Sequence, residues 1–157
     1  PIPPSPNLPN MKAVYLYPAT CYFEATPVSL GRGTSLPFQV YGHPNMTGYD
    51  YSFTPKSVPG AKNPPQLNKL CHGVNLSNMS DEEIWKRGVD LSYVIDAYKN
   101  LNIGDHFFRP FFELLVGTDY VRKMIIEGKS AEEIKSRWKG DVEKFKEQRK
   151  PYLLYQE

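Results

Sequence analysis

The sequence predicts an α+β domain in which short mixed or antiparallel strands pack against about three helices. The length of 157 residues is enough for one domain with a hydrophobic core, and 40% hydrophobic residues with a net charge of +2 are typical of a folded chain. The amino-acid composition changes between residues 79 and 80. Residues 1–79 hold 13 of the 15 prolines with five Lys or Arg and two Asp or Glu, whereas the remainder carries 14 basic and 15 acidic residues. The first part is therefore expected to be loop- and strand-like and the second helical, with no domain boundary between them.

The first ten residues have the composition of an extended linker. Five of the first nine are proline, which favours extended backbone. We interpret residues 1–10 as the remnant of an interdomain linker and residues 11–157 as one domain, cut from a longer protein.

Three strands are expected in the proline-rich part. Lys12–Tyr17 contains β-favouring residues and is followed by Pro18, and Phe38–Tyr41 and His72–Leu76 are shorter candidates. The intervening Pro44–Asn68 is rich in turn residues and is predicted to fold over the surface.

A helix is predicted to begin at Ser80. The Ser80 hydroxyl and the carboxylate of Glu83, three residues later, can each accept a hydrogen bond from an unpaired backbone N–H of the first turn. Apolar residues then recur at roughly helical spacing to Leu101, with Gly88 as a weak point and Gly104 beyond the end.

Two further helices are expected near the carboxyl end. One runs from Thr118, as N-cap, to Glu127, with Gly128 following as the residue that terminates it. The other begins at a second capping pattern, Ser130 to Glu133, and ends before Pro151. The apolar positions that share one face of this last helix are Ile134, Trp138, Val142 and Phe145. Tyr152–Tyr155 is predicted as a final buried strand.

Several function classes are disfavoured by composition and motifs. Basic and acidic residues are interleaved, which argues against nucleic-acid binding, and no segment approaches the ~18 apolar residues of a membrane span. His43, His72 and His106 are isolated from one another and from any Cys-x-x-Cys pair, so no metal site is predicted. Phosphate-binding glycine motifs are lacking as well, and no cofactor is expected.

Cys21 and Cys71 are the only cysteines. In an oxidising compartment a disulfide between them would stabilise the fold, and two buried free thiols fit the sequence as well. Both alternatives stay open at this point.

The segment from Tyr17 to Phe38 is the richest in candidate site residues, because it contains Glu24 and Arg32 in a stretch nearly free of charge. Gly31 and Gly33 flank Arg32 and allow a ligand or another backbone to approach, while the guanidinium offers a planar fork for a carboxylate. Glu24 is our candidate for a supporting catalytic role and Arg32 for binding an anionic group. The alternative is that the two side chains only pair with each other and brace a loop.

Small polar residues around this pair could orient sugar hydroxyls. The candidate substrate-binding residues are Arg32, Thr20, Thr26, Ser29, Gly31 and Gly33. A glycosidase needs two carboxyl groups roughly 5 to 9.5 Å apart. The first half of the chain offers only Glu24 and Asp50, and Asp50 is expected in a turn, so the chain alone is underequipped for hydrolysis.

The sequence resembles the carboxy-terminal part of the exo-β-N-acetylmuramidase (NamZ) family. This part was long catalogued as a domain of unknown function. The most specific match is the loop that carries Glu24 and Arg32. The matching segments are Ser5-Pro6-Asn7, Tyr17-Pro18, Thr20–Thr26, Val28-Ser29, Gly31–Thr34, Pro37-Phe38, Cys71 with Gly73-Val74, Leu115–Thr118, Ile126–Ser130, Glu133-Ile134, Trp138, Phe145, Arg149 and Tyr152–Tyr155.

This resemblance implies a two-domain glycoside hydrolase that releases N-acetylmuramic acid from non-reducing ends of peptidoglycan. The chain would be the auxiliary domain that completes a substrate cleft with an amino-terminal Rossmann-like domain, which would carry the principal catalytic acid. A periplasmic or extracellular location follows from that substrate. The alternatives are a noncatalytic wall-binding or structural module and, ranked last, a stand-alone enzyme that uses Glu24 with Asp50.

Overall fold

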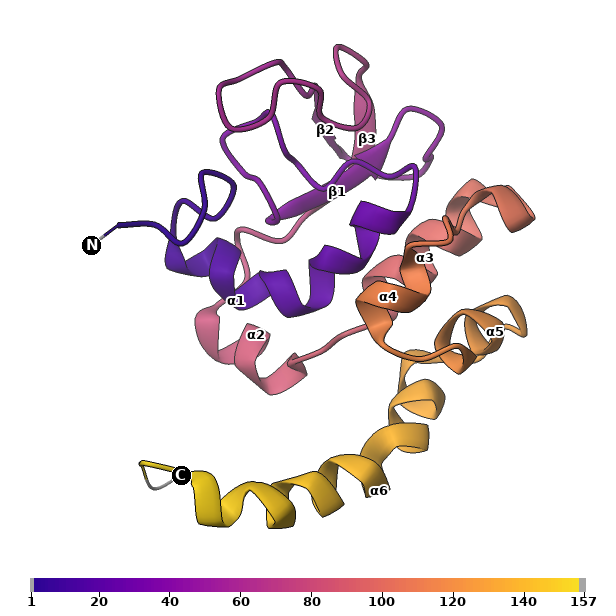
Figure 1. Ribbon diagram of the computed structural model, residues 1–157. Helices are drawn as coiled ribbons and strands as arrows, with labels where there is room; N and C mark the ends of the chain where they lie inside the picture. The colour runs from indigo at the N-terminus through magenta and orange to yellow at the C-terminus, as the bar shows by residue number, and fades with distance from the viewer. Residues whose placement is uncertain (1, 156–157) are drawn as a thin grey trace.

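A small antiparallel sheet lies at one end of the molecule, and helices surround its other side (Figure 1). The computed structural model describes residues 2–155. Strands β1 (Val40–His43), β2 (Tyr51–Phe53) and β3 (Cys71–Asn75) form the sheet in the order β1-β3-β2. The α+β class is therefore confirmed.

Two of the strands lie close to their expected positions, and the third was missed. β1 begins after Phe38, which has a positive φ of 59° and cannot continue a strand. β2 is only three residues long and lies within the segment expected to be loop, so its alternation is too short to detect. Gly42 faces Gly73 across β1 and β3, where a Cβ on Gly73 would collide with the Tyr41 carbonyl.

The prediction of a strand at Lys12–Tyr17 is wrong, because this segment belongs to helix α1 (Met11–Thr20). The Asn10 side chain accepts a hydrogen bond from the Ala13 N–H at 2.9 Å and caps the helix. The buried residues, Ala13, Leu16, Ala19 and Thr20, recur at helical spacing. This periodicity and the cap outweigh the β propensities of the segment, and Pro18 is accommodated in the last turn. The 3₁₀ helix η1 (Cys21–Ala25) continues from α1.

The region after Ser80 contains two helices where one was expected. Ser80 caps α2 (Asp81–Arg87) as predicted, accepting a hydrogen bond from the Glu83 N–H at 3.1 Å. Gly88 has φ +60° and ends this helix, so α3 (Ser92–Leu101) starts again in a new direction. The short helix η2 (Gly104–His106) follows.

Three more helices complete the chain. α4 (Phe112–Val116) was not predicted, and α5 (Tyr120–Ile126) begins after Asp119 instead of Thr118. α6 (Ala131–Arg149) has the predicted capping box, in which Ser130 and Glu133 accept hydrogen bonds from each other's backbone N–H. A 3₁₀ turn η3 (Lys150–Tyr152) follows α6, and Tyr152–Tyr155 is exposed and forms no strand.

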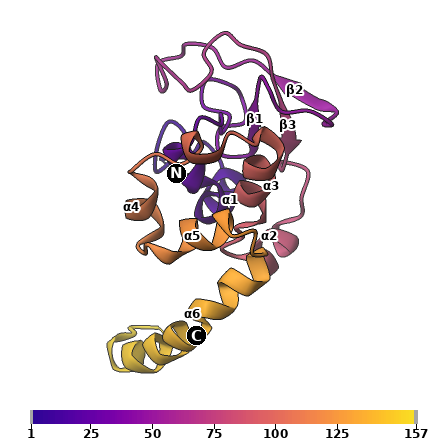
Figure 2. The same ribbon diagram turned by 90° about the vertical axis from the view of Figure 1, so that its right-hand side faces the viewer.

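The main core lies between α1, the sheet and the helices α3 to α5. Its largest fully buried side chains include Phe23, Phe107 and Phe112. Asp96 on α3 accepts hydrogen bonds from the hydroxyls of Tyr41 and Tyr49, both at 2.8 Å, and so ties α3 to the sheet region. Two views show that α6 leaves this body and extends away from it (Figures 1 and 2). Among the described helices, none is long and apolar enough to cross a membrane.

Candidate functional site

Glu24 and Arg32 line the same cavity, although they come from different segments. The cavity has a volume of about 280 Å³. Its lining residues are Ser5, Asn7, Leu8, Tyr17, Glu24, Arg32 and Phe38. The structure therefore brings the carboxylate of η1 and the guanidinium of the glycine loop together beside the proline-rich amino-terminal segment.

The amino-terminal segment forms one wall of this cavity and is attached to the body. The Asn7 side-chain amide donates to the Gly60 carbonyl at 2.9 Å. Leu8 packs against the main core, and its N–H donates to the Ser5 carbonyl at 2.9 Å. The limits of the expected linker, residues 1–10, stay a prediction, but residues 5–8 contribute directly to the candidate site.

Arg32 lies in a loop whose backbone conformation requires glycine at the two flanking positions. Gly31 and Gly33 have φ values of +79° and +83°, and a Cβ on either would collide with a backbone carbonyl, that of Leu36 or Lys56 respectively. The Thr34 hydroxyl donates to the Gly31 carbonyl at 2.7 Å and closes the turn. The two glycines thus fix the place of Arg32 through backbone geometry.

The Arg32 guanidinium is partly exposed and lacks a partner among residues 2–155. Its Nε is buried and forms no hydrogen bond, and no ion pair to Arg32 exists among residues 2–155. A buried donor without an acceptor costs about 1–3 kcal/mol, so an external acceptor would stabilise it. Glu24 likewise forms no ion pair or side-chain hydrogen bond with the described residues. The two side chains therefore do not brace the loop by pairing with each other.

The groups next to Glu24 stay protonated at neutral pH. Burial, with a smaller contribution from Glu24, raises the pKa of the Cys21 thiol to about 11. Burial and the charges of Cys21 and Glu24 raise the pKa of the Tyr17 hydroxyl. Cys21 is therefore a poor nucleophile, because the reactive thiolate is scarce.

The lining combines one cation, one carboxylate and an aromatic pair. The rings of Tyr17 and Phe38 lie 5.1 Å apart between their centroids, and Tyr17 is 38% exposed. An arginine binds a carboxylate through two parallel N–H groups, a carboxylate accepts from hydroxyl or amide donors, and an aromatic face packs on a sugar ring. This set can bind a small sugar that carries a carboxylate.

The predicted hydroxyl residues are buried, Thr20 at the end of α1 and Thr26 and Ser29 in the segment that follows η1. Thr20 donates to the Leu16 carbonyl at 3.0 Å and Thr26 to the Phe23 carbonyl at 2.9 Å. Ser29 pairs with Gly42 through its backbone, and its Oγ accepts from the Gly31 N–H at 3.4 Å. None of the three lines the cavity. Their observed role is to hold the segment that presents Glu24 and Arg32.

Other candidate groups lie elsewhere. Asp50 is exposed before β2 and is not a lining residue, so the cavity holds a single carboxylate, that of Glu24. Cys21 and Cys71 are free thiols. No group of three or more His, Cys, Asp or Glu in the described chain could hold a metal ion. A second cavity, of about 140 Å³, has Trp138 in its lining and is surrounded mainly by apolar side chains, without carboxylate or guanidinium.

The residues that form the walls of the cavity were not predicted from the sequence. They are Ser5, Asn7, Leu8, Tyr17 and Phe38. One signal was present. Tyr17, Cys21 and Glu24 follow the i, i+4, i+7 spacing of one helical face. The strand assigned to Lys12–Tyr17 concealed this spacing.

Comparison with known proteins places the chain in a family. The family model described as "Exo-beta-N-acetylmuramidase NamZ, C-terminal" matches residues 15–155. The chain is 34% identical over 167 residues to the protein named peptidoglycan beta-N-acetylmuramidase NamZ of Bacillus subtilis, covering 97% of this chain and 40% of that protein.

Two solved structures of DUF1343 family proteins from Bacteroides fragilis share the fold. One is 83% identical with a TM-score of 0.98, covering 100% of this chain and 44% of that one. The other is 20% identical with a TM-score of 0.70, covering 99% of this chain and 45% of that one, and supports the fold alone. The chain thus spans less than half the length of these relatives. Because the family model and the B. subtilis relative match nearly the whole chain, it belongs to the NamZ family and corresponds to the C-terminal part of its members.

Proposed function

We propose that this chain is the cleft-completing part of an exo-acting β-N-acetylmuramidase, which releases N-acetylmuramic acid from the non-reducing ends of peptidoglycan. Family membership and the name of the B. subtilis relative support this activity for the longer protein. Its partner is the amino-terminal domain of the same polypeptide, which we expect to be Rossmann-like. Because peptidoglycan lies outside the cytoplasmic membrane, the protein works in the periplasm or the extracellular space.

The unpaired Arg32 in the shared cavity is the observation that carries the proposal. N-acetylmuramic acid differs from N-acetylglucosamine by a lactyl ether that ends in a carboxylate. The Arg32 Nε and the rest of the guanidinium would donate to that carboxylate and gain an acceptor that the described residues do not supply. Arg32 would therefore select the muramic sugar.

Glu24 has a supporting role in this proposal. Glu24 lines the same cavity, where its carboxylate would accept hydrogen bonds from hydroxyl or amide groups of the sugar. Hydrolysis by a retaining or inverting mechanism needs a second carboxyl group roughly 5 to 9.5 Å away, and the cavity offers none. The chain alone is therefore expected to be inactive, with the principal acid in the other domain.

The test compares two substrates in the full-length enzyme. Arg32→Ala should lower kcat/KM for a chromogenic N-acetylmuramic acid glycoside by about 10- to 100-fold, the value of one or two charge-assisted hydrogen bonds. The residual activity on the N-acetylglucosamine analogue should change far less. Arg122→Ala is the matched control, because it removes a guanidinium that is already paired with Glu113. Equal loss on both substrates would refute the assignment of Arg32.

A noncatalytic wall-binding module is the second candidate, favoured by the presence of only one carboxylate in the cavity. Under this alternative the longer protein would bind muropeptides through other surfaces. Calorimetric binding that is unchanged in the double variant Glu24→Gln, Arg32→Ala would support the module. A loss of binding in the double variant would support the cleft.

A further inference from the structure

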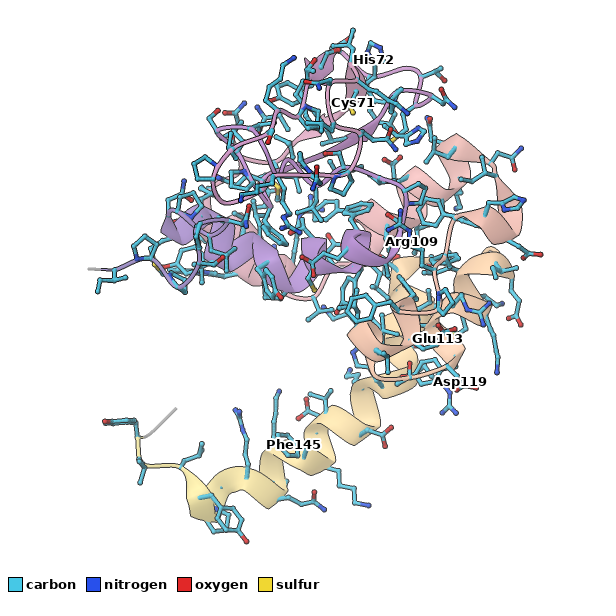
Figure 3. All side chains as sticks on the ribbon, turned by 45° about the horizontal axis from the view of Figure 1, so that its top comes forward. Cys71, His72, Arg109, Glu113, Asp119 and Phe145 are labelled. Carbon is cyan, nitrogen blue, oxygen red and sulfur yellow. The ribbon has the colours of Figure 1, made fainter. Side chains whose placement is uncertain are left out.

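One face of α6 carries an apolar stripe that runs out of the protein core into solvent. We define the α6 stripe as Ile134, Trp138, Val142 and Phe145 of α6 together with Tyr152 of the following turn η3. Ile134 is fully buried and Trp138 is partly buried against the main core. Further along, Val142, Phe145 and Tyr152 are 41%, 60% and 83% exposed. Figure 3 shows Phe145 on the part of α6 that has left the body. The apolar residues of the stripe thus keep helical spacing, but they become increasingly exposed to solvent toward the carboxyl end.

A helix of this kind is incomplete without a neighbour. α6 has 19 residues and buries only Ile134, whereas most helical stability in proteins comes from packing an amphipathic face. Large apolar side chains that follow one another on an exposed face mark a contact surface. The apolar face predicted for this helix from the sequence is thus only partly buried within this chain.

Lysines edge the stripe on one side. Lys135, Lys139 and Lys146 lie beside Trp138 and Val142 along a groove of about 460 Å³ on α6. Two of the three have a partner: Lys146 pairs with Glu143 at 3.0 Å, and Lys135 donates to the Arg87 carbonyl at 3.4 Å. Lys139 forms no ion pair with residues 2–155. Glu132 and Glu143 line the same groove, so the fitting partner is apolar at its centre and carries both signs of charge at its rim, with a carboxylate opposite Lys139.

We propose that the α6 stripe docks against the amino-terminal domain of the same polypeptide. The chain covers only 40% of its B. subtilis relative and 44% of its close structural relative, and the family model places it at the carboxyl end. More than half of such a protein is therefore available as the occupant. The amino-terminal segment of this chain and the far end of α6 lie on the same side of the molecule (Figure 1), where a preceding domain can reach both. This inference rests on family membership and is independent of the role of Arg32.

Hydrogen–deuterium exchange in the full-length protein, without substrate, tests the docking. The amides of residues 138–149 should be protected in the wild type, and Phe145→Glu or Val142→Glu should speed their exchange at least tenfold. Peptides of the amino-terminal domain that form the matching face should exchange faster in the same variants. Because both positions are already partly exposed, the body should keep its fold, which circular dichroism verifies.

Gly140→Glu is the matched control, since a Cβ there meets nothing within 4 Å and the position lies on the opposite face of α6. It should not speed exchange in either domain, because replacing a glycine in the middle of a helix favours the helix. Fast exchange of residues 138–149 in the wild type, or an equal effect of Gly140→Glu and Phe145→Glu, would overturn the proposal. Protection that rises with protein concentration, with a dimer in sedimentation that Phe145→Glu abolishes, would overturn it in favour of a second copy.

Discussion

Two places in this molecule each combine one carboxylate with one guanidinium, but the two groups form an ion pair at only one of these places. Glu113 on α4 and Arg122 on α5 form an ion pair with each other, and Figure 3 shows Glu113 far from the sheet, on the helical side. Glu24 and Arg32 line one cavity and are not paired with each other or with other described residues. The first set joins two helices, and the second leaves both charges available to a ligand.

This difference shows how a candidate binding site can be distinguished from a structural ion pair. A surface pair stabilises a protein weakly and satisfies its own charges. An arginine that a rigid glycine loop places in a cavity, with a buried Nε and no acceptor among the described residues, gains no stabilising hydrogen bond at that atom. This arrangement is the basis of the binding role proposed for Arg32.

The loop beneath Arg32 gives the largest expected effect. Gly33→Ala should lower the free energy of unfolding by roughly 2–5 kcal/mol, because the added Cβ collides with the Lys56 carbonyl at a φ of +83°. Gly117→Ala is the control, since Gly117 has a similar φ of +71° but open space around its Cβ position. It should cost only about 1 kcal/mol. Chemical denaturation measures both, and equal losses would show that the loop is not constrained by this contact.

The two arginines should differ in their effect on stability. Arg122→Ala should lower the free energy of unfolding by up to about 1 kcal/mol, because it breaks the pair with Glu113. Arg32→Ala should leave it unchanged or raise it slightly, since it removes an unsatisfied buried Nε. Denaturant midpoints of the two variants decide this, and a larger loss for Arg32→Ala would assign that residue to the scaffold.

The pH dependence of the Glu113 pair gives the smallest effect. The hydrogen bond from Arg122 holds the pKa of Glu113 below its ordinary value of 4.5. Because the folded-state pKa is depressed, the pair's contribution to stability is complete above that ordinary value and is lost as the pH falls through the folded-state pKa. The stability difference between wild type and Glu113→Gln should thus be larger at pH 7 than at pH 3. Arg122→Ala should show the same pH profile, and a difference that does not change with pH would exclude the ion pair as its source.

Local signals in the sequence predicted part of the fold correctly. Ser80 and Ser130 cap their helices as expected, and Gly128 has the positive φ of a residue that follows a helix end. Tertiary context decided the rest. Residues 12–17 have β propensity but bury one helical face against the core, and Tyr152–Tyr155 is apolar but remains exposed on this chain.

Only the two charged residues of the candidate site, Glu24 and Arg32, could be predicted from the sequence. Scarcity of charge singled out Glu24 and Arg32, and the flanking glycines explained why the loop could present an arginine. The walls could not be predicted, because Asn7 and Leu8 reach the cavity through contacts with distant segments such as Gly60. Thr20, Thr26 and Ser29 resemble ligand-binding residues in composition, yet their hydroxyls and backbone are used within the fold.

The attachment of residues 5–8 to the body has a consequence for domain motion. Asn7 and Leu8 hold a wall of the cavity against the remainder of this chain. If the amino-terminal domain reorients, the hinge lies ahead of Ser5, and the cavity moves as part of one rigid body. Under the proposed function, the sugar would then contact a surface of constant shape on this side, and the reorientation would change its position relative to the amino-terminal domain.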